Sequence, residues 1–226
     1  MNKVCLIGWP GSGKTRFHTM VSQQAQALGL SLREAPGLVW DRGATEQAWL
    51  VVDARHRIED ERERAALFNA GDALVLMFWQ EVELANQAWW LKQLKSYADN
   101  KPYALVMQAG LTDNELLKLM SAAPSAIRPD WPMLARVELT VPRLVLEHFT
   151  FVLDAMQRDP EIQLWRAVGV LDTLEYANRV AIEAGRSGFY QYDAGDMPAG
   201  CLRLEARALK PAVLEEWLSA CYAPGG

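Results

Sequence analysis

The chain has 226 residues, of which 50% are hydrophobic and 23% are charged, a composition typical of a globular protein that can bury a core. Its formal net charge of −5 and its isoelectric point near 5.3 argue against nucleic acid or an anionic membrane as the main partner. The three cysteines are far apart and give no disulfide framework, and the lack of a leader or a long apolar segment predicts a cytoplasmic protein.

Short apolar segments alternate with helical patterns over the first half of the chain. The segments 3–7, 49–52, 73–78 and 103–107 predict buried strands, and the segments 15–28, 58–69, 84–98 and 113–122 predict helices, the last with Asp113 as its N-cap. Residues 29–47 have no clean period and predict a loop with at most one short strand. This alternation predicts a parallel sheet that is covered by helices on both faces.

Prolines at positions 124, 129 and 132 predict a linker over residues 123–132, after which the pattern changes. Residues 136–141, 165–171, 179–184 and 201–208 predict strands, and residues 143–157 and 211–221 predict helices. We therefore expect two domains, residues 1–132 with the parallel sheet and residues 133–226 as a small α+β domain.

The segment between the first predicted strand and the first predicted helix reads G-W-P-G-S-G-K-T and satisfies the P-loop pattern G-x-x-x-x-G-K-[S/T]. The glycines allow backbone N–H groups to turn toward phosphate oxygens, Lys14 reaches the β- and γ-phosphates, and the Thr15 hydroxyl binds Mg²⁺. The helix that follows points its positive dipole end at the same phosphates. The predicted nucleotide-binding residues are Gly8, Trp9, Pro10, Gly11, Ser12, Gly13, Lys14, Thr15 and Arg16.

A P-loop NTPase also needs a carboxylate on a neighbouring strand that holds Mg²⁺ or its water, and Asp53 ends a hydrophobic strand in the expected way. We therefore predict Thr15 and Asp53 as the metal ligands, and Lys14 and Asp53 as the catalytic residues. The alternative is that Asp53 only caps the end of its strand.

The residues after Asp53 differ from those of a typical nucleotide switch. A glycine usually follows the acid by three residues and presents its N–H to the γ-phosphate, whereas this chain has His56 at that place. Arg55 and His56 can orient water or contact phosphate. Alternatively, the charged run 55–64 is a solvated helix face.

Recognition of guanine is not specified by the sequence. The usual N-K-x-D motif stands at the end of a later strand, and the corresponding residues 107–113 read M-Q-A-G-L-T-D. Only Gln108 is chemically similar to the asparagine of that motif, and Glu81, after the preceding strand, is another possible acceptor for a base. GTP or ATP is therefore the expected nucleotide, with Mg²⁺ as cofactor.

With the loop, Asp53 and the second domain placed, the chain resembles the CobW-type family of P-loop GTPases, several of which are associated with metal delivery. Residues 104–111 lie where that family has its base-specificity strand, residues 164–171 are similar to its R-A-K-G strand, and residues 203–221 are similar to its last strand and helix. The resemblance implies an α/β fold: a P-loop NTPase domain with a mostly parallel sheet flanked by helices, followed by a small α+β C-terminal domain.

The chain departs from the family pattern at several positions. The interval between the first helix and Asp53 is short and has no cysteine, although the family has a C-x-C-C metal motif there. The guanine motif is missing, His56 replaces the switch glycine, and Val168 replaces the lysine of R-A-K-G.

Three functions fit these residues. The first is a slow Mg²⁺-dependent GTPase that acts as a switch or a chaperone-like factor of CobW type. The second is a degenerate nucleotide-binding regulatory protein without turnover, and the third is a small-molecule ATP-dependent kinase. Nine tryptophans indicate a protein partner that binds through an aromatic-rich surface, and we expect no nucleic-acid or membrane partner.

Overall fold

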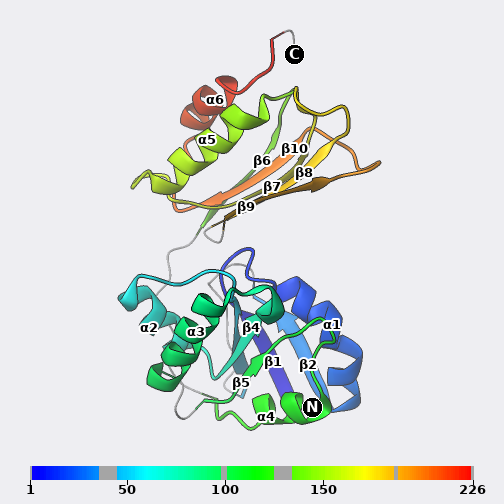
Figure 1. The fold of residues 1–226 in the computed structure, drawn as a ribbon, viewed down its shortest axis with the longest axis vertical. Helices are drawn as coiled ribbons and strands as arrows, with labels where there is room; N and C mark the ends of the chain where they lie inside the picture. The colour runs from blue at the N-terminus through cyan, green and yellow to red at the C-terminus, as the bar shows by residue number, and fades with distance from the viewer. Residues whose placement is uncertain (1, 36–44, 98–100, 125–133, 186–187, 225–226) are drawn as a thin grey trace. The chain divides into compact units, whose positions relative to one another are not determined.

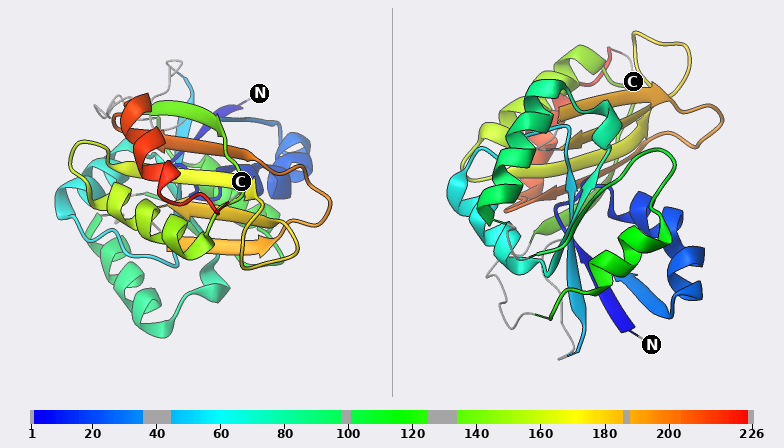
Figure 2. Two further views of the ribbon diagram at one scale, coloured as in Figure 1. Left: turned by 90° about the horizontal axis from the view of Figure 1, so that it is seen from above. Right: turned by 60° about the horizontal axis from the view of Figure 1, so that its bottom comes forward.

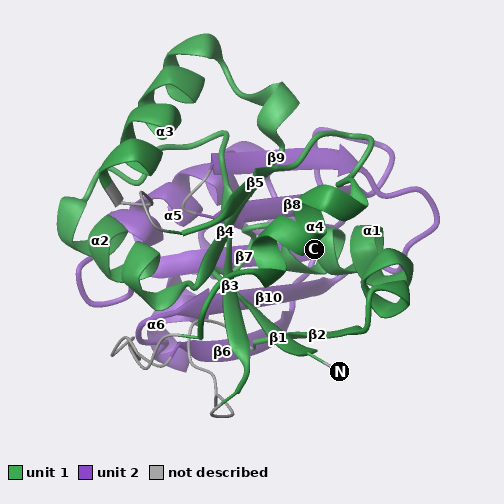
Figure 3. Cartoon of the chain, turned by 90° about the horizontal axis from the view of Figure 1, so that it is seen from below, with its two compact units in different colours: residues 1–131 green, residues 132–226 purple. Residues whose placement is uncertain are grey.

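The computed structural model describes residues 2–35, 45–97, 101–124, 134–185 and 188–224. The chain divides into two compact units, Met1–Trp131 and Pro132–Gly226, which Figure 3 distinguishes by colour. The greater part of the predicted linker, the end of the third predicted helix and residues 36–44 of the predicted loop lie outside the described residues.

The first unit is built on a five-stranded sheet in the order β2-β1-β3-β4-β5 (Figure 1). Its strands are β1 (Asn2–Ile7), β2 (Leu30–Glu34), β3 (Gln47–Asp53), β4 (Ala73–Met77) and β5 (Tyr103–Leu105). Every neighbouring pair is parallel. The central strands β3 and β4 are almost entirely buried, which explains their continuous apolar sequences.

The described residues of this unit also form four α-helices and one short 3₁₀ helix. They are α1 (Lys14–Ala27), α2 (Glu61–Ala70), η1 (Trp79–Glu81), α3 (Leu84–Tyr97) and α4 (Asp113–Met120). In Figure 1, α1 and α4 cover one face of the sheet, and α2 and α3 cover the other. On the first face, Phe17 of α1 and Leu116 of α4 share a buried cluster with Trp49 of β3. On the second face, Phe68 of α2 lies 6.3 Å from Trp90 of α3 between ring centroids.

The structure corrects the predicted starts of three helices, and local capping explains two of these corrections. The N-cap of α4 is Thr112 rather than Asp113, because the Thr112 hydroxyl accepts a hydrogen bond from the Glu115 N–H and the Glu115 carboxylate accepts one from the Thr112 N–H. Helix α2 begins at Glu61 and not at residue 58, since the Asp60 side chain caps it.

The third corrected start belongs to the second unit. Helix α5 (Leu146–Arg158) begins three residues later than predicted. The backbone before it is held by other partners, because Leu144 N–H donates to the Asp172 carbonyl and Val145 N–H donates to the Cys221 carbonyl. These long-range hydrogen bonds are not visible in a local sequence pattern.

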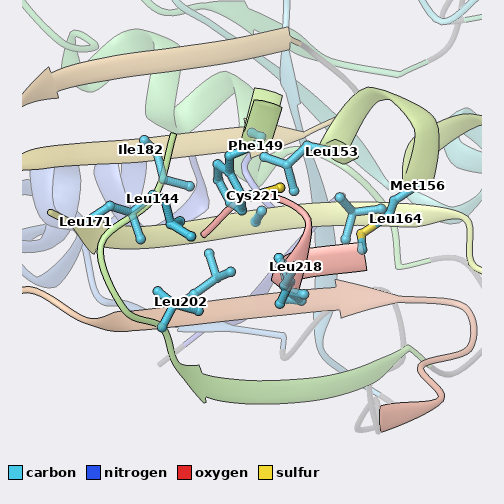
Figure 4. Packing of buried hydrophobic residues seen from close by; sticks show 14 of the residues in the cluster. Leu144, Phe149, Leu153, Met156, Leu164, Leu171, Ile182, Leu202, Leu218 and Cys221 are labelled. Carbon is cyan, nitrogen blue, oxygen red and sulfur yellow. The ribbon is translucent and has the colours of Figure 1, made fainter. Parts of the chain in front are cut away.

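The second unit has a five-stranded antiparallel sheet in the order β6-β10-β7-β8-β9. Its strands are β6 (Ala135–Thr140), β7 (Leu164–Leu171), β8 (Val180–Gly185), β9 (Gly188–Asp193) and β10 (Cys201–Ala206), and its second helix is α6 (Pro211–Ser219). Helices α5 and α6 cover one face of this sheet (Figure 2). Figure 4 shows the buried core between them, with Phe149 and Leu153 of α5 packed near Cys221 and Leu218.

Strand β9 was not predicted. It pairs only with β8 and is largely exposed, so its sequence lacks the apolar alternation of a half-buried strand.

The predicted fold class is nevertheless confirmed: a mostly parallel sheet with helices on both faces is followed by a small α+β unit. Within the described residues, no helix combines the length and the apolar character that crossing a membrane requires.

Candidate functional site

The glycine-rich loop joins the end of β1 to the start of α1. Gly8 and Gly13 have φ angles of 147° and 91°, which side chains with a Cβ rarely adopt. A Cβ on Gly8 would lie 2.2 Å from the Val51 carbonyl oxygen, and one on Gly13 would lie 3.2 Å from atoms of the Met77 and Phe78 side chains. The loop is therefore packed tightly against the ends of β3 and β4, where its backbone has little freedom.

The Lys14 side chain folds back over this loop. Its ammonium group donates to the Gly8 carbonyl at 2.7 Å and to the Trp9 carbonyl at 2.8 Å, and the residue is only 9% exposed. Two carbonyl oxygens thus surround a positive charge at the centre of the loop. Phosphate oxygens can replace these acceptors, because they are stronger partners for an ammonium group.

The other predicted loop residues have distinct positions. Ser12 is buried, and its N–H donates to the Trp9 carbonyl at 3.1 Å. Pro10 is half-buried, and Arg16 is exposed, with its guanidinium carbon 5.1 Å from the centre of the Phe78 ring. Gly11 has a φ of 81°.

Thr15 contacts a carboxylate that the sequence did not reveal. Its hydroxyl donates to Glu34 at 2.8 Å, and His18 of α1 lies 3.4 Å from the same carboxylate. Glu34 is the last residue of β2 and is level with Leu6 of β1. It falls in the predicted loop 29–47, and the only signal in the sequence was that this segment could contain one short strand.

Asp53 is the last residue of β3 and is 7% exposed. Its carboxylate accepts hydrogen bonds from Arg55: from the backbone N–H at 3.0 Å, from Nε at 3.0 Å and from Nη2 at 2.7 Å. Arg55 Nη1 also donates to Glu81 at 3.2 Å. The carboxylate that the sequence assigns to Mg²⁺ is therefore engaged by an arginine two residues away.

His56 stands where a nucleotide switch usually has glycine. The pKa of His56 is lowered from its ordinary value, mainly because burial disfavours the imidazolium and also because Arg55 is positive, although Asp53 opposes this shift. The imidazole is therefore neutral at pH 7, and it has a nitrogen that can accept a hydrogen bond from water.

Helix α3 fixes the backbone of this segment. The Trp90 indole N–H donates to the Ala54 carbonyl at 2.7 Å, and the Asn86 amide donates to the Arg55 carbonyl at 3.0 Å. Arg57 Nε in turn donates to the Asn86 side-chain oxygen at 2.7 Å. The charged run is thus not only a solvated helix face, since its first residues are tied to α3 beside Asp53.

The residues considered for base recognition have other hydrogen bonds in this structure. The Gln108 N–H donates to the Gln80 side chain at 2.9 Å, the Asp113 carboxylate accepts from Gln24 of α1, and Glu81 is paired with Arg55. None of these contacts selects guanine over adenine.

The oxygen atoms near the loop suit a hard cation. Mg²⁺ takes hydroxyl and carboxylate oxygens and usually keeps several waters with only one or two carboxylates, a set that the Thr15 hydroxyl and a carboxylate from Glu34 or Asp53 match. Within the described residues, no group of three or more histidine, cysteine, aspartate or glutamate side chains could hold a metal.

A parallel sheet whose first strand enters a glycine-rich loop, with a buried lysine over the loop and a helix directly behind it, defines a P-loop-type α/β protein. No protein-family model matches the chain, and no curated protein matches its sequence.

Two solved structures resemble the chain over nearly its whole length. One is the Zn(II)-bound YjiA GTPase from E. coli, with 11% identity, a TM-score of 0.35 and 99% coverage of both chains. The other is a Zn(II)-bound triple mutant of YjiA GTPase, with 13% identity, a TM-score of 0.34 and coverage of 99% of this chain and 100% of that chain. These values are too low to place the chain in a family.

Proposed function

We propose that the chain binds a nucleoside triphosphate at the loop 8–15 and hydrolyses it slowly, as a Mg²⁺-dependent GTPase that acts as a switch of CobW type. The observation that carries this proposal is the conformation of the loop, in which Lys14 is buried over the Gly8 and Trp9 carbonyls. A lysine held in this way faces the position of the β- and γ-phosphates in P-loop proteins.

Each loop residue has a defined task in this proposal. The backbone N–H groups of the loop and the Lys14 ammonium bind the phosphate oxygens, and the Thr15 hydroxyl turns from Glu34 to the metal. Asp53 is the predicted carboxylate partner of Thr15. Glu34 is a second candidate, because its carboxylate already contacts the Thr15 hydroxyl.

Hydrolysis needs little covalent chemistry from the protein. The oxygen of water bonds to the γ-phosphorus, the bond to the β–γ bridging oxygen breaks, and the diphosphate leaves with the electron pair, while the water proton passes to a phosphate oxygen. When bound, Mg²⁺ neutralises charge on the β- and γ-oxygens. Lys14 and the loop N–H groups stabilise the charge that develops, and His56 is the candidate residue for orienting the water.

The first experiment measures binding of GTP, GDP, ATP and ADP, each with Mg²⁺ or with EDTA, by thermal shift and calorimetry. At about 100 times the dissociation constant, nucleotide should stabilise the protein by about 2.7 kcal/mol, a shift of about 5–10 °C in melting temperature. Lys14→Ala should remove the shift, whereas Lys92→Ala, an exposed lysine on α3, should keep it. The proposal fails if no nucleotide shifts the wild type, or if Lys14→Ala shifts as much.

A nucleotide-binding regulator without turnover is the second candidate. The engagement of the Asp53 carboxylate by Arg55 and the replacement of the switch glycine by His56 favour it. Phosphate release separates the two functions: a regulator gives the Lys14-dependent shift with no release, and the GTPase gives both. An added acceptor that raises phosphate transfer would instead indicate a kinase.

The tryptophans that the structure describes do not form an exposed surface for the predicted protein partner. The tryptophans that the structure describes are all buried or half-buried, namely Trp9, Trp49, Trp79, Trp89, Trp90, Trp165 and Trp217. They pack within their units, so the partner, like the cytoplasmic location, stays a prediction.

A further inference from the structure

Arg55 lies at the centre of a compact charged cluster beside the P-loop. Its guanidinium contacts two carboxylates, Asp53 at 2.7 Å and Glu81 at 3.2 Å, and lies 4.0 Å from the centre of the Phe78 ring. The Arg55 side chain is about one-fifth exposed, at 21%. The guanidinium is therefore held by ion pairs and stacking, and it remains partly accessible to a ligand.

Phe78 connects this cluster to the phosphate loop. It has a left-handed backbone with a φ of 60°, which is uncommon for an aromatic residue and directs the chain sharply out of β4. A Cβ on Gly13 would lie 3.2 Å from this ring, and the guanidinium carbon of Arg16 lies 5.1 Å from the ring centre. Arg55 thus stacks on a ring that contacts the last glycine of the loop.

The two ion pairs of Arg55 allow an exchange of partners. Its guanidinium contacts both Asp53 and Glu81, so it can leave Asp53 and remain paired with Glu81. A guanidinium forms the same forked pair of hydrogen bonds with phosphate as with carboxylate. A terminal phosphate carries more charge than Asp53 and would enter the site from the side of the loop.

We infer that Arg55 is a second phosphate-binding residue, which leaves Asp53 and pairs with the terminal phosphate when a nucleoside triphosphate binds. The inference rests on the proposed function, since it requires a nucleotide in the loop. The exchange makes the Asp53 carboxylate available to Mg²⁺ or its water. A diphosphate does not reach the same position, so Arg55 distinguishes triphosphate from diphosphate.

The contacts of the backbone allow this exchange by rotation of one side chain. The Ala54 carbonyl is held by Trp90 and the Arg55 carbonyl by Asn86, so the backbone stays in place on α3. The Arg55 N–H continues to donate to Asp53 and keeps that carboxylate oriented after the guanidinium has left.

The test compares the affinities of GTP, GDP, ATP and ADP for full-length variants by calorimetry. Arg55→Ala should lower the affinity of the preferred triphosphate by about 10- to 100-fold, the worth of a forked charged hydrogen bond, while the affinity of the diphosphate changes by less than about threefold. Arg57→Ala is the matched control. It also removes one arginine, two residues further along the chain, but the Arg57 side chain points to α3. Its triphosphate-to-diphosphate ratio should equal that of the wild type.

A double-mutant cycle with Asp53→Asn gives a second readout in EDTA, without any metal. Asp53→Asn should bind triphosphate more tightly than the wild type, because a negative charge is removed and because Arg55 no longer has to leave its pair with Asp53; in the Arg55→Ala background this gain should be much smaller. If the gain is equally large in the double variant, it reflects only the lost negative charge, and the inference is wrong.

The outcomes separate this inference from the proposed function. If the wild type binds nucleotide through Lys14 but Arg55→Ala keeps the triphosphate preference, the inference fails and the proposed function stands. If the wild type binds no nucleotide, both fail. Melting curves without ligand establish that the Arg55→Ala variant is folded. Free guanidinium at about 10 mM should partly restore the triphosphate affinity of this variant and should not raise that of the others.

Discussion

Substituting alanine at two glycines of the first unit tests how tightly the loop is packed. Gly8 and Gly29 both have positive φ angles, 147° and 75°, so alanine is strained at either position. They differ in their surroundings: a Cβ on Gly8 meets the Val51 carbonyl oxygen at 2.2 Å, whereas a Cβ on Gly29 has no atom within 4 Å. Gly29→Ala therefore measures backbone strain without crowding, whereas Gly8→Ala adds the steric contact with β3.

The expected magnitudes follow from these two contributions. Gly29→Ala should lower the free energy of unfolding by about 1–2 kcal/mol through backbone strain alone. Gly8→Ala has at least this backbone cost, since alanine adopts a φ of 147° even more rarely than one of 75°, and it must in addition displace the loop or β3, which costs about 1–3 kcal/mol more. This difference corresponds to about 2–12 °C in melting temperature for a chain of this size.

Urea unfolding followed by circular dichroism measures both variants, and nucleotide binding gives a second readout. Gly8→Ala should also lose the Lys14-dependent thermal shift, because the displaced loop no longer presents its N–H groups, while Gly29→Ala should keep it. Equal destabilisation by the two substitutions would show that Gly8 is not packed against Val51.

Three other predictions concern single side chains. Trp90→Phe should destabilise the first unit by about 2–4 kcal/mol in urea unfolding, because it leaves the buried Ala54 carbonyl without its indole donor and leaves a small cavity; a loss below about 0.5 kcal/mol would contradict this hydrogen bond. Burial raises the pKa of the Cys221 thiol to about 11, so iodoacetamide at pH 8 should alkylate exposed Cys201 much faster than Cys221, as peptide mass spectrometry can check. Burial lowers the pKa of His56 in the folded state from its ordinary value near 6.5, so around this pH the unfolded chain binds more protons than the folded chain. The free energy of unfolding should therefore rise as the pH increases from 5.5 to 7.5, and His56→Asn should flatten this rise.

The sequence alone was sufficient for the glycine-rich loop between β1 and α1 and for the general architecture. The loop motif is a local property of eight consecutive residues, with Gly8, Gly13, Lys14 and Thr15 at fixed spacing. The fold adds only the ends of β3 and β4, against which the loop packs. The apolar runs of β3 and β4 are equally local, because strands buried on both faces need apolar residues at every position. Alternation of these runs with helices predicts a parallel sheet wherever it occurs.

The residues around the loop were decided by the tertiary structure. Glu34 reaches Thr15 only because β2 pairs with β1, and strand order is not encoded in the period of a single segment. Arg55 is two residues from Asp53 in the sequence, but no pattern indicates whether its guanidinium turns to that carboxylate, to solvent or to a ligand. Packing against Phe78 and pairing with Glu81 decide this.

The same distinction holds at the edges of elements and of sheets. The start of α5 depends on hydrogen bonds from Leu144 and Val145 to residues far along the chain, and the exposed edge strand β9 has no buried face to impose a pattern on its sequence. Local sequence determines which segments can form a strand, a helix or a phosphate loop, since these depend on backbone conformation and on burial of neighbouring residues. Which carboxylate meets which hydroxyl or guanidinium depends on contacts between distant segments, and only the folded chain brings them together.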